Sequence, residues 1–221
     1  MLRDLRLYQL ISPSLPVGSF TYSQGLEWAV EGKWVTDKES LEDWLTGILF
    51  HSLATLELPV LLRLMQALAT RDELTFMRWC NILLASRETA ELRQEERQRG
   101  AALARLLPNL NIEIPATLFA AVASTQLTGL ALAARAWDID ATKTCGGYAW
   151  SWLENMVVTG VKLIPLGQTQ GQQLLLTLAE KIPEAVTTAL AIDDTEVGST
   201  TPALAIASSL LESQYTRLFR S

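Results

Sequence analysis

Few residues in this chain have side chains suited to chemistry, and those few lie far apart in the sequence. His51 is the only histidine, and no second metal ligand stands three or four positions from it on its predicted helix. Cys80 and Cys145 belong to no CxxC pair and to no zinc-like spacing. Because a tight transition-metal site needs several nitrogen or sulfur donors that converge, the sequence predicts no metal site and no tightly bound cofactor.

Other catalytic patterns are missing as well. The chain has no GxxxxGK phosphate loop and no GxSxG motif, and a single histidine leaves no Ser-His-Asp or Cys-His arrangement. Asp193, Asp194 and Glu196 offer carboxylate oxygens within one short segment, but an acidic loop is more typical of a solvated surface. No residue is therefore predicted to be catalytic.

The composition predicts one helical domain. Hydrophobic residues make up 49% of the 221 residues, and no run alternates convincingly between apolar and polar positions. A chain of this length can bury a substantial core. We therefore expect an all-α fold, a single compact multi-helix domain over residues 1–221.

Charge and hydropathy limit the partners and the compartment. The net charge of −6 disfavours nucleic acid, whose phosphates need a concentrated cationic face. The first residues contain no apolar signal core, and the isolated cysteines are typical of a reducing compartment, so we expect a cytoplasmic protein. The only membrane candidate, residues 117–134, carries four polar residues between positions 124 and 128, which favours a buried core helix.

Helix-capping residues mark several of the predicted helices. Thr36 to Glu39 form a capping box, and Asp72 and Asp140 can each cap a later helix. The expected helical segments are 2–11, 22–30, 41–56, 59–68, 74–84, 86–107, 115–134, a helix from 141 that Pro165 ends, 168–182 and 203–219. The expected buried side of the segment after Asp72 includes Leu74, Met77, Cys80 and Leu84.

The connection over residues 12–27 is too hydrophobic to be a flexible linker. Its prolines fix the backbone, and Gly18 permits a turn that other residues resist. Leu15, Val17 and Phe20 are expected to anchor this turn in the core. Such a rigid loop is either a well-packed helix connector or a surface presented to a partner.

The helix predicted over 86–107 carries charged side chains where an apolar face is usual. Arg87 with Glu91 and Glu95 with Arg99 lie on neighbouring turns, where each pair adds roughly a few tenths of a kcal/mol. One interpretation is a solvated surface helix. The other is a polar interface with a partner.

Lys162 is the only charged residue between Glu154 and Glu180, and apolar residues flank it. Pro165 and Gly167 end its helix directly afterwards. An isolated ammonium group either reaches the surface along its apolar stem or is offered to a partner.

The C-terminal residues keep helical spacing, so we expect a docked end and not a frayed one. The residues with this spacing are Leu204, Ala207, Leu211, Tyr215 and Leu218. Arg217 and Arg220 then project from an ordered element, and Arg217 is predicted to clamp the loop over 193–202. The alternative is an arginine that is solvated and replaceable.

A dense aromatic cluster follows two glycines within one helix. Gly146 and Gly147 are expected to allow close approach of another backbone or to mark a kink. Tyr148, Trp150 and Trp152 are interpreted as core or as a dimer contact. The alternative is a helical enzyme or small-ligand-binding protein whose pocket these aromatics line.

Several segments together carry a resemblance to a known family. They are SPSLPVGSFTYSQGLE at 12–27, WAVE at 28–31, ELP at 57–59, RETAELR at 87–93, GVKLIPLGQ at 160–168 and QYTRLFRS at 214–221. Each is weak alone, but they are collinear and span nearly the whole chain. In this order they resemble the UreF family of urease accessory proteins.

The resemblance implies a helical homodimer that is a chaperone and not an enzyme. Members of this family join a UreD-type accessory protein, also called UreH, and recruit a UreG-type GTPase. The complex docks on apo-urease, and nickel passes when GTP is hydrolysed. Nickel is then handled only in the assembled complex, which agrees with the missing metal ligands.

The resemblance also implies a set of residues that face or support the GTPase. The family's lysine in the Gly-Val-Lys motif, here Lys162, is implicated in controlling the GTPase, and its tail arginine, here Arg217, braces the loop before the last helix. Some members have tyrosine where Phe20 stands, and phenylalanine lacks the hydroxyl through which that tyrosine supports the loop. The expected residues are Lys162, Phe20, Arg217, Asp193, Asp194, Tyr215 and Arg220.

We predict that the isolated chain has no tight nickel site, because one histidine and two distant cysteines do not converge. Equilibrium dialysis of the purified protein against nickel measures this directly. Stoichiometric binding at submicromolar nickel would contradict the prediction, unless a symmetric dimer site joins two His51 side chains.

Overall fold

The computed structural model describes residues 1–199, 201–212 and 214–220. Positions 200 and 213, which fall in the predicted 193–202 loop and the last predicted helix, lie outside this set, as does Ser221. Over the described residues the fold is all-α, as predicted, with helices and turns and no strand. The elements are α1 (Leu2–Ile11), η1 (Ser19–Thr21), α2 (Leu26–Glu31), α3 (Lys38–Ile48), η2 (Leu49–Glu57), α4 (Leu58–Thr70), α5 (Glu73–Ala85), α6 (Ala90–Leu106), η3 (Leu107–Leu110), η4 (Ala116–Leu118), α7 (Phe119–Val122), α8 (Gln126–Ala136), α9 (Ala141–Leu163), α10 (Gln168–Ala179), α11 (Ile182–Ala191) and α12 (Pro202–Leu211).

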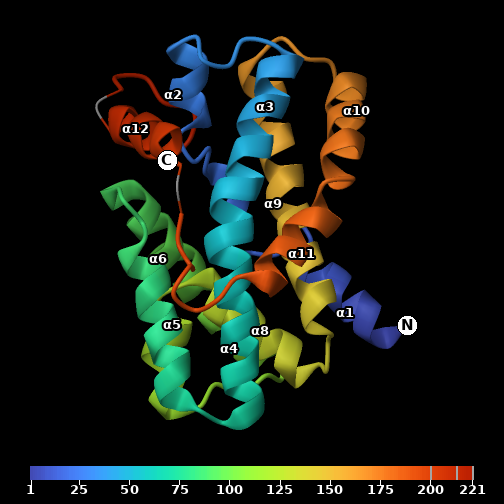
Figure 1. The fold of residues 1–221 in the computed structure, drawn as a ribbon, viewed down its shortest axis with the longest axis vertical. Helices are drawn as coiled ribbons and strands as arrows, with labels where there is room; N and C mark the ends of the chain where they lie inside the picture. The colour runs from blue at the N-terminus through green and yellow to red at the C-terminus, as the bar shows by residue number, and fades with distance from the viewer. Residues whose placement is uncertain (200, 213, 221) are drawn as a thin grey trace.

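One long helix runs through the middle of the molecule (Figure 1). It joins α3, the π-helical η2 and α4 without a break over Lys38–Thr70, 33 residues in all. Pro59 has no N–H to donate to the Thr55 carbonyl, and the Gly198 N–H donates to that oxygen at 3.0 Å. The loop before α12 is therefore attached to the middle of this central helix. α4 packs against α5 and α8, and α9 packs against α1 and α10.

The central helix, and not residues 117–134, has the length and composition of a membrane span among the described residues. Its apolar window is 67% buried inside the protein, which is typical of the core helix of a soluble protein. The continuous helix predicted over 117–134 is wrong, because α7 ends at Val122 and α8 begins at Gln126. Thr125 caps α8 by accepting a hydrogen bond from the Thr128 N–H at 3.2 Å.

Two of the three predicted helix caps are correct, and one is misplaced by a residue. Asp72 and Asp140 cap α5 and α9 as predicted, each accepting from the backbone N–H three residues later. The box predicted from Thr36 to Glu39 is wrong by one position. Asp37 caps α3 instead and forms a reciprocal box with Ser40.

Several helix limits and faces also differ from the prediction. The helix predicted over 22–30 begins only at Leu26. A separate helix, α11, occupies Ile182–Ala191, where the sequence predicts the end of one helix and no further helix before residue 203. The buried face of α5 is rotated by about one residue, since Leu74 is 78% exposed whereas Phe76 is buried. These helix limits and buried faces depend on packing between distant segments, which local sequence patterns do not reveal.

Helix α6 is not the solvated surface helix that its many charged residues suggest. Glu95 and Glu96 are buried, and so is Arg87 just before the helix. The predicted pair of Glu95 with Arg99 is confirmed at 2.6 Å. The predicted pair of Arg87 with Glu91 is wrong. Within the part of the chain that the structure describes, Arg87 forms ion pairs with Glu57 and Glu96 instead.

Two glycines in long helices give a matched test of this packing. A Cβ at Gly100 of α6 would lie 2.5 Å from the Thr125 backbone nitrogen, whereas a Cβ at Gly146 of α9 would meet nothing within 4 Å. Gly100→Ala should therefore destabilise the fold by about 1–3 kcal/mol through overpacking. Gly146→Ala should be neutral or stabilise it by up to about 1 kcal/mol through helix propensity. Thermal unfolding of both variants measures the difference, and equal melting temperatures would contradict this account of the α6–α8 contact.

Candidate partner-binding groove

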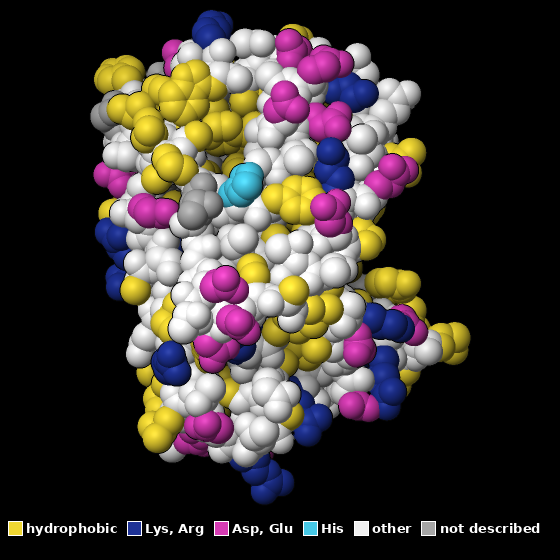
Figure 2. Space-filling view, in the orientation of Figure 1, with side chains coloured by type: hydrophobic (Ala, Val, Ile, Leu, Met, Phe, Trp, Pro, Cys, Tyr) yellow, Lys and Arg dark blue, Asp and Glu magenta, His cyan; other side chains and the backbone are white. Residues whose placement is uncertain are grey.

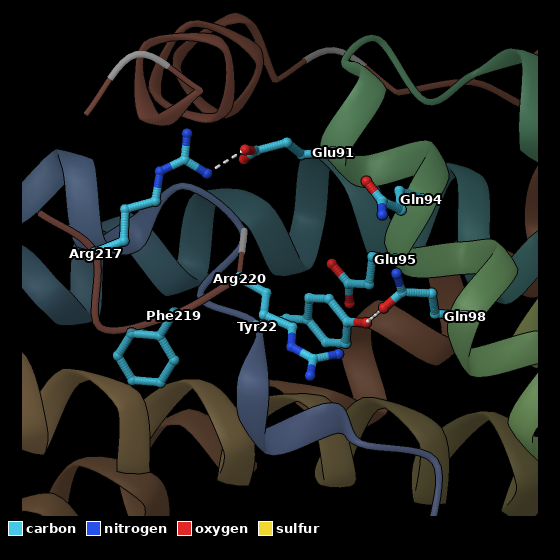
Figure 3. Close-up of a pocket in the computed structure, with 8 residues that line it drawn as sticks. All are labelled: Tyr22, Glu91, Gln94, Glu95, Gln98, Arg217, Phe219 and Arg220. Carbon is cyan, nitrogen blue, oxygen red and sulfur yellow. Dashed lines mark hydrogen bonds and ion pairs between the residues drawn. The ribbon is translucent and has the colours of Figure 1, made fainter. Parts of the chain in front are cut away.

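Three segments that are distant in the sequence meet at one groove: the loop over residues 12–25, helix α6 and the C-terminal tail over residues 214–220. The groove contains a cavity of about 420 Å³ (Figure 3). A neighbouring hollow of about 480 Å³ shares Tyr22, Gln98 and Arg220 with it. The cavity is lined by Tyr22, Glu91, Gln94, Glu95, Gln98, Arg217, Phe219 and Arg220.

The N-terminal wall of the groove is the loop over residues 12–25, which is packed against the core. Leu15 and Val17 are buried and hold it in the core. Gly18 has a φ of 73° and leads into the short 3-10 turn η1, which directs Phe20 outward. The prediction that Phe20 anchors the loop is wrong, since its side chain is 59% exposed. Phe20 instead lines the second hollow.

Gly25 fixes the end of this loop against α12. Its φ of 81° is a conformation that residues with a Cβ rarely adopt. An added Cβ would also lie 2.9 Å from the Ser208 backbone nitrogen. Glycine is therefore required here both by the turn and by the close approach of α12, and α2 starts directly after it.

Helix α6 contributes polar side chains spaced by three or four residues, which places them on one face toward the groove. Tyr22 donates from its hydroxyl to Gln98 Oε1 at 2.5 Å. Gln24 donates to Glu95 Oε1 at 2.9 Å and accepts from Trp152 Nε1 at 2.8 Å. Burial and the neighbouring Glu95 carboxylate raise the pKa of Tyr22, so its hydroxyl stays a donor.

The tail arginines lie in the groove, but with other partners than expected. Arg217 Nη1 donates to Glu91 Oε1 of α6 at 2.5 Å, so the predicted clamp of Arg217 on the 193–202 loop is wrong. Arg220 donates from its backbone N–H to the Thr21 carbonyl at 2.8 Å. The positive charge of its guanidinium beside the Tyr22 hydroxyl acts against the rise in the pKa of that group. Figure 3 shows both arginines between the tail and α6.

The tail is docked, as predicted, but not as a helix. α12 ends at Leu211, and Tyr215 is fully exposed beyond it. Phe219 is the tail's buried side chain, at 7% exposure, and in Figure 3 its ring points away from α6. Lys162, exposed in the last turn of α9, has its Nζ 5.8 Å from the centroid of that ring. The tail therefore brings Lys162 next to the groove.

Asp193 and Asp194 do not belong to this groove. Asp194 accepts from Nε of Arg63 in α4 at 2.6 Å. The backbone N–H of Asp193 donates to Glu196 within the loop itself. Of the residues predicted to face a partner, the structure brings together Phe20, Lys162, Arg217 and Arg220, with Tyr215 exposed on the same tail.

The predicted aromatic cluster of α9 packs inside the protein. Tyr148 and Trp152 belong to the hydrophobic core, and Trp150 is half-buried against it. Gly147 accommodates Leu7 and Ile11 of α1, so close helix packing explains this glycine. These contacts favour the core interpretation over a ligand pocket lined by the aromatics.

No group of three or more His, Cys, Asp or Glu side chains is arranged to hold a metal ion within the part of the chain that the structure describes. His51 is exposed on η2, and its side chain is the histidine visible at the surface in Figure 2. Burial raises the pKa of both thiols, that of Cys145 to about 12, so neither forms a thiolate readily.

Sequence reasoning missed four residues that build the groove. Tyr22 and Glu27 lie inside the loop motif and Phe219 lies in the tail motif, but the sequence alone predicts no separate role for any of them. Glu91 was paired with the wrong arginine. The sequence does indicate a polar helix face here, because Glu91, Gln94, Glu95 and Gln98 are spaced three or four residues apart.

Comparison with known proteins agrees with the sequence resemblance. Residues 35–179 match the family model UreF. The chain is 51% identical over 223 residues to the urease accessory protein UreF of Alcanivorax borkumensis, covering 98% of this chain and 97% of that protein. It is 46% identical over 220 residues to the protein of the same name from Alkalilimnicola ehrlichii, covering 100% and 96%. The UreF protein of Citrobacter koseri is 48% identical over 217 residues, with 98% and 97% covered. The chain therefore belongs to the UreF family of urease accessory proteins.

Proposed function

We propose that this chain is a scaffold in urease maturation. As a member of an accessory-protein family it is not itself an enzyme. In this proposal it joins a UreD- or UreH-type accessory protein, recruits and regulates a UreG-type GTPase, and acts on apo-urease so that nickel is inserted. It works in the cytoplasm as a homodimer, and it holds no tightly bound cofactor of its own.

The groove is the surface that we assign to the GTPase. The observation that carries this assignment is the convergence of Arg217, Arg220 and Phe20 at its walls, with Lys162 beside the tail. Arginine and aromatic side chains, Phe and Tyr among them, are enriched at protein–protein interfaces, and Arg and Tyr are among the residues that most often dominate the binding energy. Phe20 at 59% exposure and Tyr215 on the tail supply such aromatic groups.

A pull-down with purified components tests the scaffold. The chain is immobilised and offered a UreG-type GTPase, with and without a UreD-type protein. We expect the GTPase to be retained when the UreD-type protein is present. Failure to retain it under either condition, with a folded bait, would contradict the proposal.

Arg217→Ala should weaken GTPase recruitment while the helical fold and the dimer survive. The variant loses the ion pair with Glu91, and it leaves that carboxylate, 14% exposed, without its arginine. A charged hydrogen bond of this kind contributes roughly 1.5–3 kcal/mol, enough for about a tenfold loss of affinity if docking needs an ordered wall.

Circular dichroism, dimer mass and the pull-down measure these three properties. Arg97→Ala is the matched control, because Arg97 is exposed on α6 and is not among the lining residues of the groove. Full recruitment by a folded Arg217→Ala protein would remove Arg217 from the site.

Lys162→Ala should fold normally and should change GTPase binding or turnover in the assembled complex. Its ammonium group is exposed beside Phe219, so its loss removes a charge from the surface and little packing from the core. Lys162→Arg keeps a cation over the ring and should behave like the wild type. Unchanged GTP hydrolysis and unchanged urease activation in Lys162→Ala would show that the residue merely reaches the surface.

A further inference from the structure

The C-terminal tail is held mainly by one buried carboxylate. Glu27, in the first turn of α2, is 7% exposed. Its Oε1 accepts from the Leu218 N–H at 2.5 Å, and its Oε2 accepts from the Phe219 N–H at 2.9 Å. The next N–H, that of Arg220, goes to the Thr21 carbonyl. Consecutive backbone donors of the tail are thus bound by α2 and by the N-terminal loop.

The other contacts that join the tail to the helices are made by its side chains. Leu218 is 66% exposed and Tyr215 is fully exposed, so among these apolar residues only Phe219 contributes substantial burial. The ion pair of Arg217 with Glu91 fixes one side chain but not the backbone. A bidentate carboxylate, in contrast, sets both the position and the direction of the chain, because its two oxygens bind adjacent N–H groups.

We propose that Glu27 is a positioning residue that holds the tail in place and so assembles the groove. Its two hydrogen bonds, to the Leu218 and Phe219 N–H groups, are called the latch below. With the latch closed, Arg217 reaches Glu91 on α6 and Phe219 lies under Lys162 of α9. With the latch open, the wall that carries Arg217 and Arg220 is lost, although the helices are not. The consequence for recruitment rests on the proposed function of the groove, but the latch itself does not.

Two variants break the latch from opposite sides. Glu27→Gln turns one oxygen into an NH2 group that faces a backbone N–H, so one of the two hydrogen bonds is replaced by a repulsive contact. Leu218→Pro removes the donor to Oε1 without touching the helices. Each has a matched control. Glu31→Gln changes an exposed carboxylate of the same helix, and Leu218→Ala removes the exposed side chain but keeps its N–H.

Hydrogen exchange of the full-length chain measures the latch directly. We expect the peptide that contains residues 214–221 to exchange about tenfold faster or more in Glu27→Gln and Leu218→Pro, and at the wild-type rate in both controls. Peptides from α4 and α9 should keep their protection in Leu218→Pro. Wild-type exchange of the tail in Leu218→Pro would overturn the latch, even if Glu27→Gln failed to fold.

The GTPase pull-down separates the latch from the function of the groove. Loss of recruitment in the two latch variants, with both controls intact, is the result that we expect. If the tail exchanges faster but recruitment is unchanged, the latch stands and the groove is not the GTPase surface. If the tail is unaffected and recruitment falls, Glu27 does not act through the tail and the proposal is wrong.

Discussion

The buried guanidinium of Arg87 makes the ionic contact that joins α6 to the central helix, and the groove depends on where α6 lies. It donates to Glu57 Oε1 at 2.7 Å and to Glu96 Oε1 at 2.5 Å, and all three residues are buried. Burial alone would lower the pKa of Arg87, but the two carboxylates raise it well above its ordinary value. Removing one member of such a buried group typically costs about 3–5 kcal/mol, because a charge is left unpaired. Arg87 therefore fixes α6 against the π-helical part of the central helix.

The groove follows from this placement in a few steps. With α6 fixed, Gln98 accepts from Tyr22 of the loop over 12–25, and Glu91 accepts from Arg217 of the tail. Gly25 brings the end of that loop against α12 and starts α2. α2 presents Glu27 to the tail. The groove is thus assembled from backbone geometry and buried charge, with apolar packing supplying the helices that carry it.

The sequence predicts interactions between neighbouring residues best, although it places the capping box of α3 one position early. Helix caps at Asp72 and Asp140 were predictable, because the capping bond joins residues three positions apart. The fold class followed from periodicity, which is also local. The partner of Arg217 was not predictable, since Glu91 lies on a helix that only the folded chain brings near. The same holds for the charges of α6, whose pattern alone is that of a surface helix. The loop motif was correctly located, although physical reasoning misplaced the side chain of Phe20.

The way the tail is attached explains how it can serve the groove. Glu27 binds backbone N–H groups, so the side chains of Leu218 and Arg220 take no part in this attachment. Leu218 is exposed at the surface, and Arg220 lines the groove. Phe219 and Arg217 point to different helices, toward Lys162 of α9 and Glu91 of α6. A substitution at Lys162 of α9 or at Glu91 of α6 therefore removes a contact of the same short segment, residues 217–219. Lys162 and the arginines of the tail, which the sequence places far apart, form one surface for as long as this segment is held.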